Sequence, residues 1–152
     1  MELFVGKHLN KVDKKGRVTV PKSFRAALNK QTFNGVYVFP QFKYAALEAC
    51  SERFIRMISQ SLNELPMFSD DQDDLSIILE NTFPLAFDSE GRIILSAELL
   101  DAAEIEGDVV FVGRGVRFQI WRPETYHSAR EPTIERFRTR GLTLSLSSLN
   151  SE

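Results

Sequence analysis

The sequence predicts an α+β protein in which one motif is used twice around a pseudo-two-fold axis. The stretch 13-DKKGRVTVPKSFR-25 returns as 88-DSEGRIILSAELL-100, and each copy is followed by a pair of strand-like runs, in 35–49 and 107–121, and then by a helix. Half of a chain of 152 residues makes a poor hydrophobic core alone. We therefore expect the halves to pack together as a pseudo-two-fold β-barrel or interleaved sheet with flanking helices.

The repeat also sets the expected domain boundaries. We predict a first half over residues 1–66, a second half over residues 67–140 and a flexible C-terminal tail over residues 141–152. The tail is rich in Ser and has no charged residue before its last position, which is typical of a weakly packed chain end.

Signals at the helix ends mark two short helices that follow the repeated stretches. The segment 21–29 begins with Pro21, which suits a first helical position because its missing N–H would be unpaired there. The matching segment 96–105 begins with Ser96, a favourable N-cap. Each half is therefore expected to place a short helix directly after its charged loop and strand.

Longer helices are expected after the strand pairs. Apolar residues recur at helical spacing through 47–65, and the acidic stretch 69–81 starts with a residue that can cap a helix. The segment 123–138 begins with Pro123, and Pro132 should interrupt it.

The segment 8-HLNKVDKKGRVTV-20 is expected to form a hairpin with residues 13–16 as its loop. Gly16 can supply the positive φ of a tight turn, and Asp13 can bond the loop backbone. The apolar side chains expected to face the core are Leu9, Val12, Val18 and Val20.

Lys14 and Lys15 lie in this loop, and Arg17 follows it directly on the strand side, so three cations gather at the tip of the hairpin. A β-ribbon is narrow enough to enter the major groove of duplex DNA, which is about 12 Å wide. Arg can bond guanine O6 and N7 as a bidentate pair, and neighbouring Lys side chains can neutralise phosphates. The loop is therefore a candidate contact to duplex DNA.

The charge distribution also points to a polyanion. The whole chain has a net charge of −2, yet residues 1–30 contain eight Lys or Arg and two acids. The local charge is thus +6, and the other 122 residues sum to −8. An asymmetry of this size favours a nucleic-acid-facing N-terminal end, although a solvated basic face is the simpler alternative.

At these residues the chain resembles the MraZ family, bacterial transcriptional regulators tied to the division and cell wall gene cluster, within the AbrB-like (SpoVT-AbrB) swapped-hairpin DNA-binding group. The resemblance covers roughly residues 1–140. It rests on the two DxxGR stretches at 13–25 and 88–100 and on 110-VFVGRGVRFQIWRPETYH-127.

The resemblance implies a fold, an assembly and a function. The fold would be a duplicated AbrB-like swapped-hairpin β-barrel with flanking helices. The chain would form a homo-oligomeric ring, commonly octameric. It would bind double-stranded DNA at direct repeats in its own promoter and regulate transcription there.

The resemblance also implies the DNA-binding residues. In the second copy Ser89 replaces Lys14, Glu90 replaces Lys15 and Leu100 replaces Arg25, so that copy is expected to bind DNA weakly or to serve only the structure. The residues expected to contact DNA or shape the loop are Lys14, Lys15, Gly16, Arg17, Arg25 and Arg92.

Other interpretations of these arginines stay open. Arg17 could only pair with Asp13, Arg92 could pair with an acid of its own loop, and Arg25 could bridge to an acid of a neighbouring subunit. Two other classes of function also stay open: a ring-forming structural or protein-interaction module, and an antitoxin-type AbrB-like regulator.

The sequence gives no sign of an enzyme. His8 and His127 lack partners at metal-ligand spacing, the single Cys50 allows no internal disulfide, and no catalytic triad or phosphate loop is recognisable. We expect no cofactor, no metal and no small-molecule substrate. No apolar run approaches the ~20 residues of a membrane span, and the N-terminus does not resemble a signal peptide, so we expect a cytoplasmic, nucleoid-associated protein without a membrane partner.

Overall fold

A computed structural model describes residues 2–141 and 144 of the chain. Apart from Gly141 and Leu144, the predicted flexible tail lies outside the described residues. In chain order the elements are β1 (Lys7–Lys11), β2 (Arg17–Thr19), α1 (Lys22–Ala27), β3 (Gly35–Pro40), β4 (Ala46–Cys50), α2 (Glu52–Asn63), α3 (Asp70–Leu75), α4 (Ile77–Glu80), β5 (Phe83–Ala86), β6 (Arg92–Ile94), α5 (Ala97–Ala102), β7 (Asp108–Gly113), β8 (Arg117–Trp121) and α6 (Pro123–Arg140).

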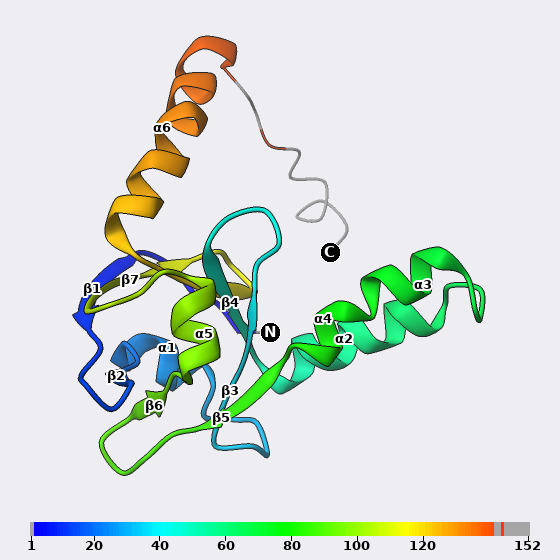
Figure 1. Cartoon of the computed structure of the whole chain (residues 1–152), viewed down its shortest axis with the longest axis horizontal. Helices are drawn as coiled ribbons and strands as arrows, with labels where there is room; N and C mark the ends of the chain where they lie inside the picture. The colour runs from blue at the N-terminus through cyan, green and yellow to red at the C-terminus, as the bar shows by residue number, and fades with distance from the viewer. Residues whose placement is uncertain (1, 142–143, 145–152) are drawn as a thin grey trace, which may run out of the picture.

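The strands form a six-stranded antiparallel sheet in the order β1-β7-β8-β4-β3-β5 and a separate two-stranded ribbon of β2 and β6 (Figure 1). Strands β1, β3 and β4 of the first half correspond to β5, β7 and β8 of the second. If each strand is exchanged for its counterpart, the same strand order results, read from the opposite edge of the sheet. The predicted α+β class is confirmed, and the strand order has the expected pseudo-two-fold symmetry.

The predicted closed β-barrel is wrong, because the six-stranded sheet is open with β1 and β5 at its edges. Strands β2 and β6 have three residues each and pair only with each other, so no pairing between described strands closes the sheet from β1 to β5. The edge strands pair across the halves, β1 with β7 and β5 with β3. The observed arrangement is thus the interleaved sheet that the repeat allowed as the other outcome.

The hairpin predicted over residues 8–20 has its turn but not its strand pair. The Asp13 N–H donates to the Arg17 carbonyl at 2.9 Å, which closes the turn, but β1 then pairs with β7 and β2 with β6. The prediction that Leu9 faces inward is wrong, since 78% of it is exposed. The other three residues of that set, Val12, Val18 and Val20, are buried as expected.

The helix ends agree with the sequence in most places. The Ser96 side chain accepts a hydrogen bond from the Leu99 N–H at 3.3 Å and so caps α5. The helix predicted over 47–65 begins later, at Glu52, because Leu47 and Cys50 belong to strand β4. A short apolar run fits a buried strand as well as a helix, and here the strand is observed.

Helix α6 does not stop at Pro132, and the prediction of an interruption there is wrong. Proline removes the N–H that would bond the carbonyl of Ser128. Ser128 is exposed, so water can satisfy that carbonyl while the helix continues.

The main core lies between one face of the sheet and the segments carrying α1, α5, β2 and β6. Phe24 of α1 stacks near Phe118 of β8 and Phe4, with ring centroids 4.8 Å and 5.3 Å away. The opposite face, called here the outer face, carries a smaller cluster in which Trp121 and Tyr126 pack together. Phe24 therefore anchors the helix that follows the first charged loop.

Candidate nucleic-acid interface

The first loop, residues 13–16, is organised by one carboxylate. Asp13 Oδ1 accepts the backbone N–H groups of Lys15 and Arg17, each at 2.9 Å, and Oδ2 accepts Arg17 Nε at 2.7 Å. These bonds, the one from the Arg17 backbone N–H foremost, lower the pKa of Asp13 below its ordinary value. The loop is thus held by a charged residue that also fixes Arg17.

Gly16 lets this loop lie directly on the second half. Its φ is +83°, and its carbonyl accepts the Leu95 N–H at 2.8 Å. A Cβ at this position would lie 2.5 Å from the Leu95 carbonyl oxygen. Only glycine fits both the left-handed backbone and the close approach.

The second loop, residues 88–91, repeats this geometry. Asp88 accepts the N–H groups of Glu90 and Arg92 at 2.9 Å and Arg92 Nε at 2.7 Å, and these bonds lower the pKa of Asp88, with the Arg92 backbone N–H as the largest cause. Gly91 has a φ of +75°, and its carbonyl accepts the N–H of Val20 at 3.1 Å. The two DxxGR stretches therefore form the same turn twice.

The loops differ in how their arginines are neutralised. Arg92 Nη2 also pairs with Glu90 at 2.9 Å. The side-chain hydrogen bond to Asp88 is the largest cause that raises the pKa of Arg92, and the negative charges of Asp88 and Glu90 raise it further. Within the described residues, the Arg17 side chain forms a hydrogen bond only through Nε, and the exposed side chains of Lys14 and Lys15 form no ion pair. The first loop thus keeps an open guanidinium edge and two free ammonium groups, which the second lacks.

Arg25 lies beside the second loop although it belongs to the first half. Its Nε donates to the Val20 carbonyl at 3.0 Å, and its guanidinium lies against Gly91. A hollow of about 350 Å³ beside it is lined partly by Lys22, Arg25 and Asp88. The counterpart of Arg25, Leu100, packs partly against the core instead.

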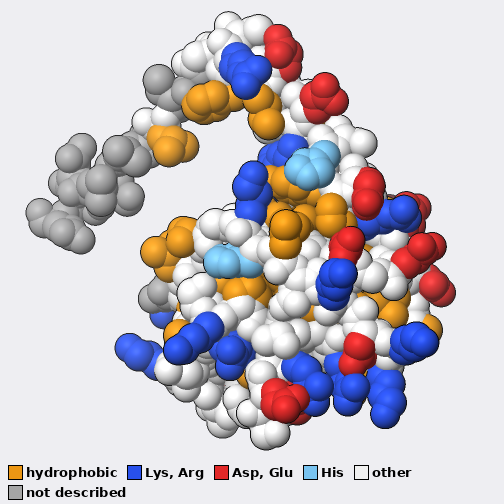
Figure 2. All heavy atoms as spheres, turned by 90° about the vertical axis from the view of Figure 1, so that its left-hand side faces the viewer, with side chains coloured by type: hydrophobic (Ala, Val, Ile, Leu, Met, Phe, Trp, Pro, Cys, Tyr) orange, Lys and Arg blue, Asp and Glu red, His pale blue; other side chains and the backbone are white. Residues whose placement is uncertain are grey.

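The structure brings all six predicted residues to one side of the molecule. The β2–β6 register pairs Arg17 with Ile94 and Thr19 with Arg92, so the two arginines mark opposite ends of the short ribbon. Both loops lie at the lower left of Figure 1, and Figure 2, which faces that side, shows Lys and Arg side chains gathered in its lower part. Gly16 is buried within this surface, and the cationic side chains are exposed or half-buried.

Sequence reasoning missed Asn10 as a residue that supports the site. Its Nδ2 donates to the Thr19 carbonyl at 2.8 Å and so ties β1 to β2, which do not otherwise pair. The expectation that Leu9 faces inward placed Asn10 on the outward face by strand alternation, so only the observed fold reveals the position of Asn10 and its partner.

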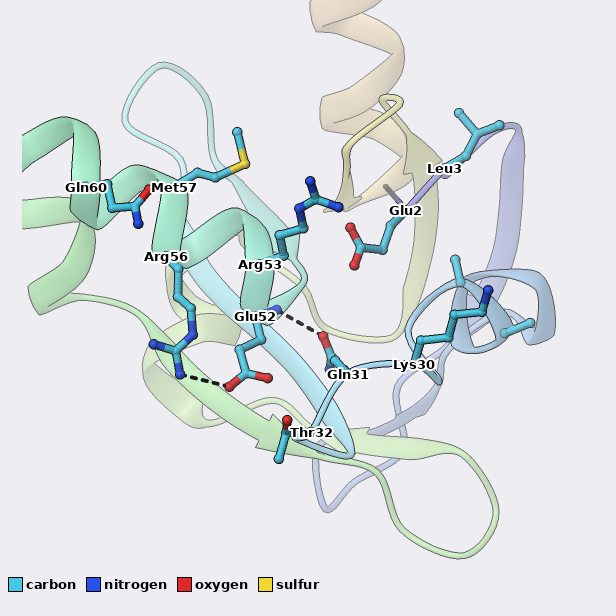
Figure 3. Close-up of a pocket in the computed structure, with 12 residues that line it drawn as sticks. Glu2, Leu3, Lys30, Gln31, Thr32, Glu52, Arg53, Arg56, Met57 and Gln60 are labelled. Carbon is cyan, nitrogen blue, oxygen red and sulfur yellow. Dashed lines mark hydrogen bonds and ion pairs between the residues drawn. The ribbon is translucent and has the colours of Figure 1, made fainter.

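A larger groove, of about 1110 Å³, lies away from the loops (Figure 3). The N-terminal segment, the end of α1 and the start of α2 line it, with Arg56 paired to Glu52 at 3.2 Å. None of the six predicted residues lines this groove. Among the described residues there is also no cluster of His, Cys, Asp and Glu suited to a metal, and no described helix has the length and apolar character to cross a membrane.

Comparison with known proteins agrees with the resemblance in the repeated loops. The family model described as "MraZ protein, putative antitoxin-like" matches residues 78–140. A transcriptional regulator MraZ of Rickettsia bellii (strain OSU 85-389) is 41% identical over 128 residues, which are 83% of this chain and 85% of the relative. The chain belongs to the MraZ family.

A second MraZ relative extends the comparison to another genus. The transcriptional regulator MraZ of Pelagibacter ubique (strain HTCC1062) is 44% identical over 125 residues, which are 82% of this chain and 81% of the relative. Alignments of this length cannot fit within residues 78–140, so the similarity to MraZ proteins includes part of the first half as well as the second loop.

Proposed function

We propose that this MraZ-family protein is a DNA-binding transcriptional regulator that reads duplex DNA with its first loop. The relatives are named transcriptional regulators, which supports the general role. The observation that carries the proposal is that Asp13 holds Arg17 through Nε and leaves both Nη groups without a described partner.

An arginine held in this way is suited to reading a base. Because the Asp13 carboxylate fixes the guanidinium, less side-chain freedom is lost when its Nη groups bond O6 and N7 of a guanine. Lys14 and Lys15 lie beside it and would contact phosphates, which set the register of the protein on DNA.

We assign lesser roles to Arg92 and Arg25. Arg92 is held by Asp88 and also neutralised by Glu90, so the second loop would bind DNA weakly. Arg25 would add charge near the duplex while bracing the second loop from the first half.

The finer features of the proposal rest on the resemblance to the family. We propose a homo-oligomeric ring that places several first loops along one surface, binding direct repeats in the promoter of its own operon within the division and cell wall gene cluster. A loop that binds weakly alone gains affinity once a neighbouring loop is bound, because the second event becomes intramolecular. The protein would then be cytoplasmic and associated with the nucleoid, and its halves, residues 1–66 and 67–140, would be AbrB-like units.

The test is a mobility-shift assay with the DNA upstream of the protein's own gene. Arg17→Ala should abolish the shift without changing the mass of the assembly, and Arg92→Ala should weaken it less. Unchanged binding by Arg17→Ala would show that the first loop is not the reading element. Equal loss from both variants would refute the unequal roles of the two loops.

Two other functions give different outcomes. The description "antitoxin-like" favours an antitoxin-type regulator, which would bind DNA and also copurify with a toxin. A ring-forming interaction module would assemble but would not show the steep fall of DNA affinity with salt concentration that phosphate contacts produce.

A further inference from the structure

The last turns of α6 extend beyond the body of the protein. Tyr126 is buried on the outer face and Ala129 packs beside it, after which the helix leaves the sheet (Figure 1). Ile134 and Phe137 are 49% and 65% exposed. At about 100° per residue, Phe137 lies on the same side of the helix as Tyr126, with Ile134 next to it. The apolar side of α6 therefore continues where none of the described residues covers it.

This exposed end is also cationic. Arg136, Arg138 and Arg140 surround Phe137 in the last two turns, and none of them forms an ion pair with a described residue. An apolar strip between unpaired arginines fits a surface that is both apolar and acidic.

The arm formed by α2, α3 and α4 has that complementary surface. Helix α3 presents four exposed aspartates, and none of them forms an ion pair with a described residue. Leu75 and Ile77 are 47% and 43% exposed beside these aspartates. By helical spacing, Asp71 lies next to Leu75 and Asp74 next to Ile77.

The pseudo-symmetry indicates what α6 lacks. Helices α2 and α6 follow β4 and β8, which are counterparts in the two halves. Helix α3 packs on α2, with Gln72 Nε2 donating to the Leu62 carbonyl at 3.2 Å. The second half provides no such helix for α6 within the described residues.

We propose that the exposed end of α6 docks on α3 and α4 of a second copy of this chain, with arginines facing aspartates around an apolar centre. The two surfaces cannot meet within one chain, because α6 and α3 project from different sides of the body (Figure 1). This contact deepens the proposed function, since it specifies which surfaces join the copies of the homo-oligomer.

Paired charge reversals test the contact. Arg138→Glu/Arg140→Glu makes α6 repel α3, and Asp71→Arg/Asp74→Arg makes α3 repel α6. We expect each variant, measured alone by size exclusion with light scattering, to fall to the mass of a single chain while the wild type remains an oligomer. A control, Glu98→Arg/Glu106→Arg, reverses two exposed acids outside both helices and should keep the wild-type mass.

Mixing the two charge-reversed variants in equal amounts separates docking from misfolding. Each variant then meets a partner of opposite charge, and the oligomer should reappear. The contact is refuted if the wild type has the mass of one chain, if either reversed variant keeps the wild-type mass, or if the mixture stays at the mass of one chain.

This contact and DNA reading by the first loop can fail separately. Arg138→Glu/Arg140→Glu keeps Arg17, so this variant should still bind a DNA fragment with a single site. Only the gain in DNA affinity from tandem sites should disappear. Arg17→Ala should show the reverse, an intact assembly that binds no DNA.

Discussion

The guanidinium of Arg25 occupies the space that a side chain at Gly91 would need, with Cζ and Nη1 each 2.5 Å from the ideal Cβ position. Arg25 belongs to the first copy of the motif and Gly91 to the second, so the first copy braces the second loop. At the symmetric position, Gly16, the obstacle is the backbone carbonyl of Leu95. The nearest obstacle to a Cβ is thus a flexible side chain at Gly91 and fixed backbone at Gly16.

This difference predicts unequal costs for the same substitution. Gly91→Ala and Gly16→Ala both force Ala into a positive φ, at a cost of roughly 1 kcal/mol. Arg25 can move away from the new methyl group, whereas the Leu95 carbonyl cannot. We expect Gly16→Ala to lower the free energy of unfolding by about 2 kcal/mol more than Gly91→Ala, as measured by urea denaturation. Equal losses would contradict the fixed-backbone explanation.

The two loop carboxylates predict a loss of stability in acid. The pKa values of Asp13 and Asp88 are lowered in the folded state, so the unfolded chain binds more protons near the ordinary aspartate value of 3.8. Their contribution is complete when the unfolded carboxylates are ionised and is lost as the pH falls from about 5 through 3. Asp13→Asn and Asp88→Asn should each flatten the dependence of the unfolding free energy on pH in this range. A slope identical to that of the wild type would show that the carboxylate bonds contribute nothing.

The local geometry of the site was predictable because short-range signals encode it. The repeated Gly after an Asp predicted two tight turns, and the pairing of Arg17 with Asp13 was one of the alternatives that the sequence left open. Such features depend on residues within four positions of each other.

The partners of the strands were not predictable in the same way. An alternating pattern shows that 8–20 contains strands, but it does not show that β2 pairs with β6 rather than with β1. The same limit explains Asn10 and Arg25, whose roles depend on which backbone the fold brings beside them.

The buried carboxylate of Glu48 predicts a large effect far from the loops. Glu48 is 6% exposed and accepts Arg117 Nε at 2.6 Å and the side-chain amides of Gln41 and Gln119 at 2.7 Å. Glu48→Ala leaves these donors without an acceptor and should cost roughly 3 kcal/mol of unfolding free energy. Glu48→Gln keeps an acceptor oxygen and should cost less in the same urea titration. Equal losses from the two variants would mean that the charge, not the acceptor oxygen, is what matters.

The second loop should become a DNA-binding loop when its charge is made to match the first. Ser89→Lys/Glu90→Lys removes the acid that pairs with Arg92 Nη2 and adds two cations beside the same turn. DNA affinity should rise, and the slope of log affinity against log salt should steepen by about 2, close to one unit per added phosphate contact.

The matched control for this gain is Ser61→Lys/Glu64→Lys, which makes the same change of net charge at exposed positions of the α2 arm, away from both loops. Because those cations lie on a different side of the body, they should leave the salt slope close to that of the wild type. An equal gain from both variants would mean that net charge, and not the geometry of the Asp88–Arg92 turn, determines binding at this loop.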